Sequence, residues 1–236
     1  MVGKAVFMLV LFIANTIQTI TGFAGNMLAM PPSMQLVGYD TSKMVLNVFT
    51  LIACLVISYE NRKDIQWKVL FKMCFLMLIG MAFGIKLVEC FDLKILSYGY
   101  GIMIIAIALK KLFIKKEISI SPIFMFIVLL GAGIIHGMFV SGGALLVIYA
   151  VWALPDKNKF RATVAPVWVV LGIAMIFSHI NSGIYTRDNI ILAAISLVPL
   201  ILSIKLGNRI YNKINQTTFL KITYVLLLVS GLFVFV

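Results

Sequence analysis

The fold is decided by a glycine-bearing break inside an apolar segment, Ile20-Thr21-Gly22-Phe23-Ala24-Gly25-Asn26-Met27-Leu28-Ala29-Met30-Pro31. Backbone groups freed by such a break are costly in hydrocarbon, so the break survives only where protein or a water-filled cavity satisfies them. A second break follows in the other half of the chain, Gly137-Met138-Phe139-Val140-Ser141-Gly142-Gly143-Ala144-Leu145-Leu146-Val147. Two matched breaks in the two halves of an apolar chain are typical of a transporter's binding site.

Composition indicates an all-α integral membrane protein. Of the 236 residues, 62% are hydrophobic and only 12% are charged, which lies far outside the averages of soluble domains. We interpret residues 1–236 as a single membrane domain. The first eleven residues carry one lysine and continue directly into apolar sequence, so we expect a first membrane segment there and no cleaved signal peptide.

The net charge of +12 is explained by membrane topology, because Lys and Arg accumulate in cytoplasmic loops. The expected partners are therefore the lipid bilayer and a small anionic substrate, and not nucleic acid. The three cysteines, Cys54, Cys74 and Cys90, are scattered and form no C-x-x-C motif. We expect no disulfide framework, no metal site and no cofactor.

The chain divides into two halves of the same order. Repeat one covers residues 1–109, a basic linker covers 110–117, and repeat two covers 118–236. Each half begins with a broken segment and continues with three spans, predicted at Lys43–Tyr59, Trp67–Val88, Leu93–Leu109, Phe160–Phe177, Ile190–Ile204 and Thr218–Val236. Gly80 and Gly84 in the first half correspond to Ser203 and Gly207 in the second, and small residues at this spacing favour close helix packing.

The distribution of charge tests this topology. If each broken segment enters and leaves on one side as a re-entrant hairpin, most of the 20 Lys and Arg residues face the cytoplasm. The exceptions are Lys4, Lys43, Lys86, Lys94 and Arg187. Two complete crossings would divide the charges equally, so the positive-inside rule favours a hairpin for the second segment. A crossing by the first segment alone moves only Lys4, and the charges therefore leave that segment open. Two hairpins would make the halves inverted repeats.

The second arm of each hairpin begins just after the glycines, near Asn26 and Gly143. A helix N-terminus presents unpaired N–H groups and about half a positive charge. Inverted repeats would bring two such N-termini together near the midplane, which predicts an anion site that needs no buried Lys or Arg. The predicted substrate-binding residues are Thr21, Gly22, Gly25, Asn26, Asn47, His136, Ser141, Gly142, Gly143 and Thr163.

Several of these positions have an equally simple packing explanation. His136 is the titratable residue near a break, and its pattern fits a packing histidine as well as a site residue. The same holds for Asn47 and Thr50 in the first half and for Thr163 with Trp168 in the second. No Asp or Glu lies deep in an apolar run, so the sequence predicts no carboxylate proton relay.

The chain resembles the TauE/SafE family of sulfite exporters and related permeases. The resemblance rests on the first break, on Phe160-Arg161-Ala162-Thr163-Val164-Ala165 and on Leu206-Gly207-Asn208-Arg209-Ile210. It implies movement of small sulfur-containing or organic anions across the cytoplasmic membrane. Ala24, Asn26 and Ser141 stand where the family often has glycine, so the resemblance names a substrate class and not one anion.

Three functions are consistent with these patterns. The first is a secondary transporter or facilitator that exports a small anion such as sulfite, a sulfonate or another organic anion. The second is an intramembrane serine hydrolase with Ser141 as nucleophile and His136 or His179 as base, although a rhomboid-type pattern would need glycine at Phe139. The third is a non-transporting membrane subunit or channel. We expect the first and therefore expect no enzymatic activity.

Overall fold

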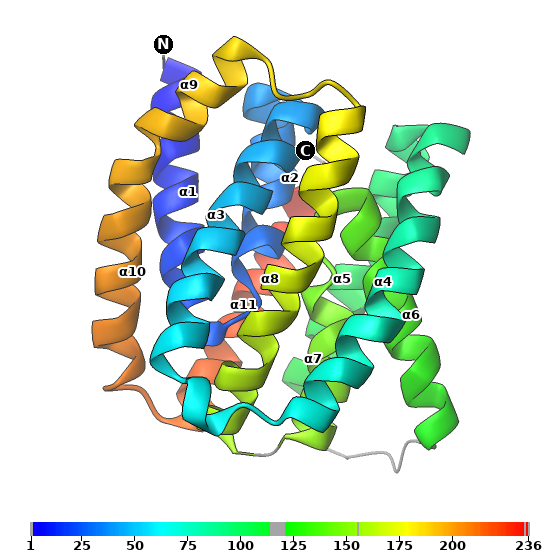
Figure 1. The fold of residues 1–236 in the computed structure, drawn as a ribbon, viewed down its shortest axis with the longest axis vertical. Helices are drawn as coiled ribbons and strands as arrows, with labels where there is room; N and C mark the ends of the chain where they lie inside the picture. Colours follow the sequence, from blue (N-terminus) through cyan, green and yellow to red (C-terminus); the bar gives the residue numbers. More distant parts are fainter. Residues whose placement is uncertain (1, 114–120, 155, 234, 236) are drawn as a thin grey trace.

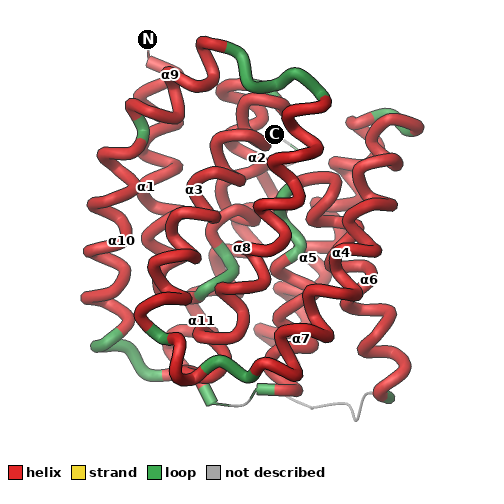
Figure 2. Tube along the Cα trace, viewed as in Figure 1, coloured by secondary structure: helices red, strands yellow, loops and turns green. Residues whose placement is uncertain are grey.

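The computed structural model describes residues 2–113, 121–154, 156–233 and 235, and these residues form helices joined by short loops (Figures 1 and 2). The helices of the first half are α1 (Val2–Thr21), α2 (Gly25–Val37), α3 (Tyr39–Glu60), the short 3-10 helix η1 (Arg62–Asp64), α4 (Trp67–Cys90) and α5 (Leu93–Phe113). Those of the second half are α6 (Pro122–Phe139), α7 (Gly143–Ala153), α8 (Lys157–Asn181), α9 (Arg187–Ile195), α10 (Leu197–Tyr211) and α11 (Gln216–Phe233).

Several helices have the length and composition of membrane spans. Among the described residues, four segments qualify: α3, α4, α8 and the continuous stretch Arg187–Tyr211 that contains α9 and α10. On α4, Phe71, Phe75 and Phe83 recur on one helical face and are all exposed. An exposed aromatic stripe of this kind is unfavourable in water and suits a lipid-facing surface. The protein is therefore a multi-pass membrane protein, as the composition predicts.

Helices α1 and α2 form an antiparallel pair. Near one end, Gly3 of α1 lies beside the carbonyl oxygen of Leu36 of α2, and near the loop Gly25 packs against Gln18. Gly25 is required there, because a Cβ atom would lie 2.5 Å from the Gln18 Cβ and 2.6 Å from the Ala14 carbonyl oxygen. The loop between the two helices lies inside the bundle near its mid-height (Figure 2).

Helices α6 and α7 form the second pair. Gly131 of α6 packs against Leu145 of α7, and Gly142 in the connecting loop packs against the Ala132 backbone of α6. In Figure 1, α1 and α2 reach the end of the bundle that carries the N-terminus, whereas α6 and α7 reach the opposite end. The two pairs thus point toward each other with their loops in the interior.

The other helices enclose these pairs in a regular manner. Helix α1 packs on α10 and α6 packs on α4, while α3 pairs with α8 and α5 with α11. Small residues allow the first two contacts: a methyl group on Gly80 or Gly84 would collide with the carbonyl oxygen of Leu130 or Ile134 on α6. A Cβ on Gly207 would lie 2.6 Å from the Thr19 Cβ of α1. The close packing predicted for these glycines is present.

Some boundaries differ from those that the sequence predicts. Helix α6 continues through Gly137 to Phe139, so the second break is confined to residues 140–142. Pro31 lies inside α2, so the first break comprises only residues 22–24. Helix α5 extends to Phe113, and the rest of the predicted linker at 110–117 lies outside the described residues. The span predicted at Ile190–Ile204 is divided at Ser196 between α9 and α10.

Candidate functional site

The first break turns the chain through a glycine in the left-handed region. Gly22 has φ +81°, a conformation that disfavours any side chain. Thr21, the last residue of α1, accepts hydrogen bonds at its Oγ1 from the backbone N–H groups of Phe23 (3.2 Å) and Ala24 (3.0 Å). The loop is therefore held by its own side chain, as required of a break in an apolar interior.

Gln18 completes the first break from one turn earlier on α1. Its Oε1 accepts from the N–H of Gly25 at 2.8 Å, and its Nε2 donates to the Gly22 carbonyl at 3.3 Å and to the Cys54 Sγ at 3.3 Å. Three backbone N–H groups at the start of α2 are thus satisfied within the protein. We call residues 21–26 the first tip.

The second break has a different construction. Val140 is the non-glycine residue with positive φ in the described chain, at +52°, and its N–H donates to the His136 carbonyl at 2.7 Å. The Ser141 hydroxyl hydrogen-bonds the Tyr100 hydroxyl of α5. Helix α7 then begins at Gly143 without a side-chain cap. We call residues 140–143 the second tip, and in this tip no N-cap side chain satisfies the backbone N–H groups at the start of α7.

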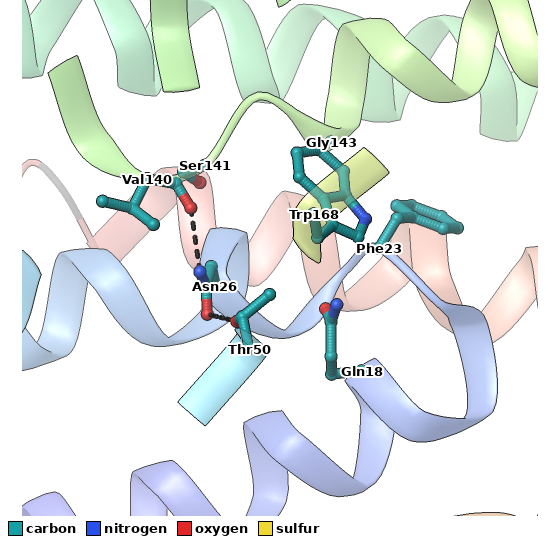
Figure 3. A pocket seen from close by; sticks show the side chains of 8 residues that line it. All are labelled: Gln18, Phe23, Asn26, Thr50, Val140, Ser141, Gly143 and Trp168. Atoms are coloured by element: carbon teal, nitrogen blue, oxygen red, sulfur yellow. Dashed lines mark hydrogen bonds between the residues drawn. The ribbon is translucent and has the colours of Figure 1, made fainter. Parts of the chain in front are cut away.

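The two tips meet directly (Figure 3). The Asn26 Nδ2 donates to the Val140 carbonyl at 2.9 Å, and the Asn26 Oδ1 accepts from the Thr50 hydroxyl of α3 at 2.6 Å. Gly143 lies so close to the first tip that a Cβ would be 2.6 Å from the Phe23 carbonyl oxygen. From α8, the indole N–H of Trp168 donates to the Gly22 carbonyl at 2.8 Å. Four helices thus converge on one point.

A small cavity of about 10 Å³ lies between the tips, close to the size of one water molecule. Its walls come from both tips and from α1, α3 and α8, and the residues that line it are Gln18, Phe23, Asn26, Thr50, Val140, Ser141, Gly143 and Trp168. These residues carry amide, hydroxyl and indole groups and no charge. The helices α2 and α7 both begin at this cavity, so the partial positive charges of two helix N-termini point toward it.

The structure places seven of the ten predicted site residues at the tips, in two groups. Asn26, Ser141 and Gly143 line the cavity. Thr21, Gly22, Gly25 and Gly142 lie in the tips beside it and fix their backbone, without lining the cavity itself.

Three further predicted residues lie away from the cavity wall. The Asn47 Nδ2 donates to the Gly172 carbonyl at 3.0 Å and joins α3 to α8. The Thr163 Oγ1 accepts from the N–H of Gln66 at 3.0 Å and ties the start of α4 to α8. His136 lies behind the wall, with its ring 5.3 Å from that of Trp168. A substrate-binding role for these residues stays a prediction.

Two participants were not identified from the sequence. Gln18 precedes Gly22 by four residues, and this spacing places both on one helical face, so the signal was present. Tyr100 lies 41 residues from Ser141 and reaches it only through the tertiary packing of α5.

The hydrolase geometry is absent among the described residues. The Ser141 hydroxyl is bonded to Tyr100, whereas neither ring nitrogen of His136 or His179 has a hydrogen-bond partner. A nucleophilic serine needs a base within hydrogen-bond reach. The described residues likewise contain no group of three or more His, Cys, Asp or Glu side chains placed to hold a metal ion.

Arg161 anchors the first tip from the opposite side. Its side chain lies under Gly22, donates from Nε to the Thr19 carbonyl at 3.0 Å and from Nη2 to the Asn208 Oδ1 at 2.5 Å, and stacks on the Tyr211 ring. This buried arginine therefore joins α8 to α1 and α10.

The comparison with known families agrees with this architecture. The family model described as "Sulfite exporter TauE/SafE" matches residues 7–234, which is nearly the whole chain. The chain belongs to the TauE/SafE family. Searches of curated proteins and of solved structures give no match to it. Members of the TauE/SafE family are membrane transporters of anions such as sulfite, so this chain is a transporter and not an enzyme. The motifs at Phe160–Ala165 and Leu206–Ile210 that suggested the TauE/SafE family contain Arg161 and Asn208 of the anchor.

Proposed function

We propose that this TauE/SafE protein is a secondary transporter or facilitator that exports a small anion through the point where the two tips meet. The expected substrates are sulfite, a sulfonate or another small organic anion. The observation that carries the proposal is that α2 and α7 both begin at one polar, uncharged cavity. Two helix N-termini that converge in a low-dielectric interior form an anion site from backbone dipoles.

We infer different tasks for the two tips from their contacts. At the first tip, Thr21 and Gln18 already occupy the N–H groups of residues 23–25, so the principal donor is the Asn26 side-chain amide once it is released from the Val140 carbonyl. At the second tip, α7 has no side-chain cap, and Ser141 supplies a hydroxyl at its start. We infer that an anion binds closer to the N-terminus of α7 and that Asn26 and Ser141 orient it.

Two inverted repeats, at residues 1–109 and 118–236, explain the pairing of the helices. In such a repeat, α1 corresponds to α6, α4 to α10, α3 to α8 and α5 to α11. The contact of α1 with α10 then corresponds to the contact of α6 with α4, and the pairs α3–α8 and α5–α11 join corresponding helices. The opposed helix pairs support re-entrant hairpins that enter from opposite sides. With the positively charged end of the bundle in the cytoplasm, both termini lie outside.

Transport requires the tips to separate. A cavity of about 10 Å³ is too small for sulfite, so the present conformation is closed around the site. The bond from Asn26 to Val140 is the direct polar link between the tips. Rocking of one repeat against the other would break this link and open the site to one side.

A negative membrane potential inside the cell favours export of an anion. Moving a monovalent anion out of a cell with a negative interior gains about 2.3 kcal/mol per 100 mV. A site made of neutral donors releases its anion more readily than a site with a paired arginine. The absence of carboxylates from the cavity lining is consistent with a uniporter that needs no proton relay.

A thermal-shift screen of the purified protein tests the substrate class. Sulfite, sulfate, thiosulfate, small sulfonates and small carboxylates are titrated at constant ionic strength. A ligand that binds the folded state raises its stability as its concentration exceeds its dissociation constant. We expect stabilisation by sulfite or a sulfonate that is reduced in Ser141→Ala. No stabilisation by any of these anions would contradict the proposal.

A further inference from the structure

A second group of polar side chains, three of them buried and one partly buried with a buried hydroxyl, lies between the tips and the end of the bundle that carries the N-terminus. It comprises Lys43 near the start of α3, His136 on α6, His179 near the end of α8 and Tyr185 in the loop after α8. Lys43 is 7% exposed, His136 1% and His179 2%. In Figure 1 the start of α3 and the end of α8 lie at the same end of the bundle.

These side chains lack the partners that burial normally demands. In the part of the chain that the structure describes, Nδ1 and Nε2 of His136 and of His179 and the Tyr185 hydroxyl are buried without a hydrogen-bond partner. Each such group costs free energy, and a native structure that retains several of them in one place has a reason to do so.

Lys43 is equally unusual, because buried lysines are almost always paired with a carboxylate. Its ammonium group lies 5.3 Å from the centre of the Tyr39 ring, which is a cation–π contact. Asp40 and Glu89 act on it only at longer range, and no described carboxylate reaches ion-pair distance. A positive charge in the interior of a membrane protein without a counter-ion indicates a substrate or ion pathway.

The members of this group are linked by charge and by ring contacts, and the group adjoins the site. Lys43 lies close enough to both imidazoles for its positive charge to act on them, and His179 also acts on His136. His179 is 6.2 Å from the Tyr185 ring. His136 contacts Trp168, which lines the central cavity. Tyr39, which stacks under the lysine, donates its hydroxyl to the Met138 carbonyl just before the second tip.

We propose that Lys43, His136, His179 and Tyr185 form a second anion subsite, on the outer side of the tips. The subsite offers one ammonium, two imidazoles and one hydroxyl, which together suit a small oxyanion. An anion that passes the tips exchanges the helix N-termini for Lys43 before it reaches the outside. This proposal rests on the transport function above, because a subsite on the path presupposes a path.

Isothermal titration of sulfite into the protein in nanodiscs tests the subsite. Lys43→Gln removes the charge, and the matched control Lys86→Gln removes the same charge from an exposed position on α4. We expect Lys43→Gln to weaken sulfite binding at least tenfold, the effect of losing a charge-assisted hydrogen bond, while Lys86→Gln stays within about twofold. His179→Gln serves as a second variant, with an expected loss of several-fold, and it decides the matter if Lys43→Gln does not fold.

Two results would overturn the subsite. One is wild-type affinity in folded Lys43→Gln and His179→Gln, and the other is an equal loss in Lys86→Gln. Sulfite flux into vesicles that contain the wild-type protein separates this failure from failure of the transport function. Flux in the wild type together with unchanged binding in both variants rejects only the subsite. No binding and no flux in the wild type rejects the transport function as well.

Discussion

Replacement of Asn26 by alanine is the sharpest test of the contact between the tips. The substitution removes the 2.9 Å bond to the Val140 carbonyl and the 2.6 Å bond from Thr50. Each buried hydrogen bond contributes about 1 kcal/mol net, and the stranded Val140 and Thr50 groups add a desolvation cost of about 1–2 kcal/mol. We expect the folded state to lose about 3–4 kcal/mol in total, measured as a lower melting temperature.

The effect on sulfite binding follows from the same contacts. An amide that donates to a charged ligand contributes about 1.5–3 kcal/mol, and release of the Asn26 amide from Val140 costs about 1 kcal/mol in the wild type. The difference of about 0.5–2 kcal/mol predicts roughly 2- to 30-fold weaker binding in Asn26→Ala.

Asn47→Ala is the matched control for this prediction. Asn47 is also buried and makes a 3.0 Å bond from its Nδ2 to a backbone carbonyl, that of Gly172, but it lies away from the cavity. Since Asn47 does not line the cavity, we expect this variant to lose stability and to keep wild-type sulfite affinity, whereas weaker binding would support the substrate-binding role that the sequence predicts for Asn47. Unchanged affinity in Asn26→Ala, or an equal loss of affinity in Asn47→Ala, would refute the assignment of Asn26 to the site.

Three further substitutions examine the parts that hold the site. Gly22→Ala, at φ +81°, should lower the free energy of unfolding by about 1–3 kcal/mol and weaken sulfite binding. The control Gly183→Ala, at φ +70° with no atoms near the added methyl group, should leave sulfite binding unchanged. Thermal shift measures the stability of both variants, and titration measures their sulfite affinity. Gly84→Ala should lower the melting temperature by an amount that corresponds to about 1–3 kcal/mol, because the methyl group forces α4 away from α6; a wild-type melting temperature would contradict that packing. Tyr100→Phe should lower the free energy of unfolding by about 1 kcal/mol, because the hydrogen bond to Ser141 is lost. Sulfite binding should be retained, since the Ser141 hydroxyl still faces the cavity. Loss of binding would mean that the Tyr100 hydroxyl itself contacts the anion.

Features with a strong local cause were predictable from the sequence. The glycines at Gly22 and Gly25 mark the first break because no other residue fits a positive φ or the contact with Gln18. The spacing of Gly80 and Gly84 predicts close packing of α4 against another helix, and the structure shows this packing. The short apolar arm after each break indicates a helix too short to span a membrane. These signals sufficed for the helical, membrane-spanning fold, whereas the position of the site stays a prediction.

Features that depend on tertiary packing were not predictable. Gly137 resembles the start of a break, yet α6 continues through it because Gly137 packs against the Met81 backbone of α4. Asn47 and Asn26 look alike in the sequence, and only the fold directs one to Gly172 and the other to the second tip. Polar residues in an apolar span thus reveal that a contact exists, but not with which helix it is made.

Potential-driven flux of sulfite from proteoliposomes tests the central claim most directly. Vesicles loaded with labelled sulfite contain the wild-type protein or Asn26→Ala, and a potassium gradient with valinomycin imposes a negative interior. The wild type should show saturable efflux that accelerates with the imposed potential, by up to the equivalent of about 2.3 kcal/mol per 100 mV. Asn26→Ala should need higher sulfite concentrations for the same rate. Efflux that neither saturates nor responds to the potential, or that is identical in the two proteins, would contradict an anion site between the tips.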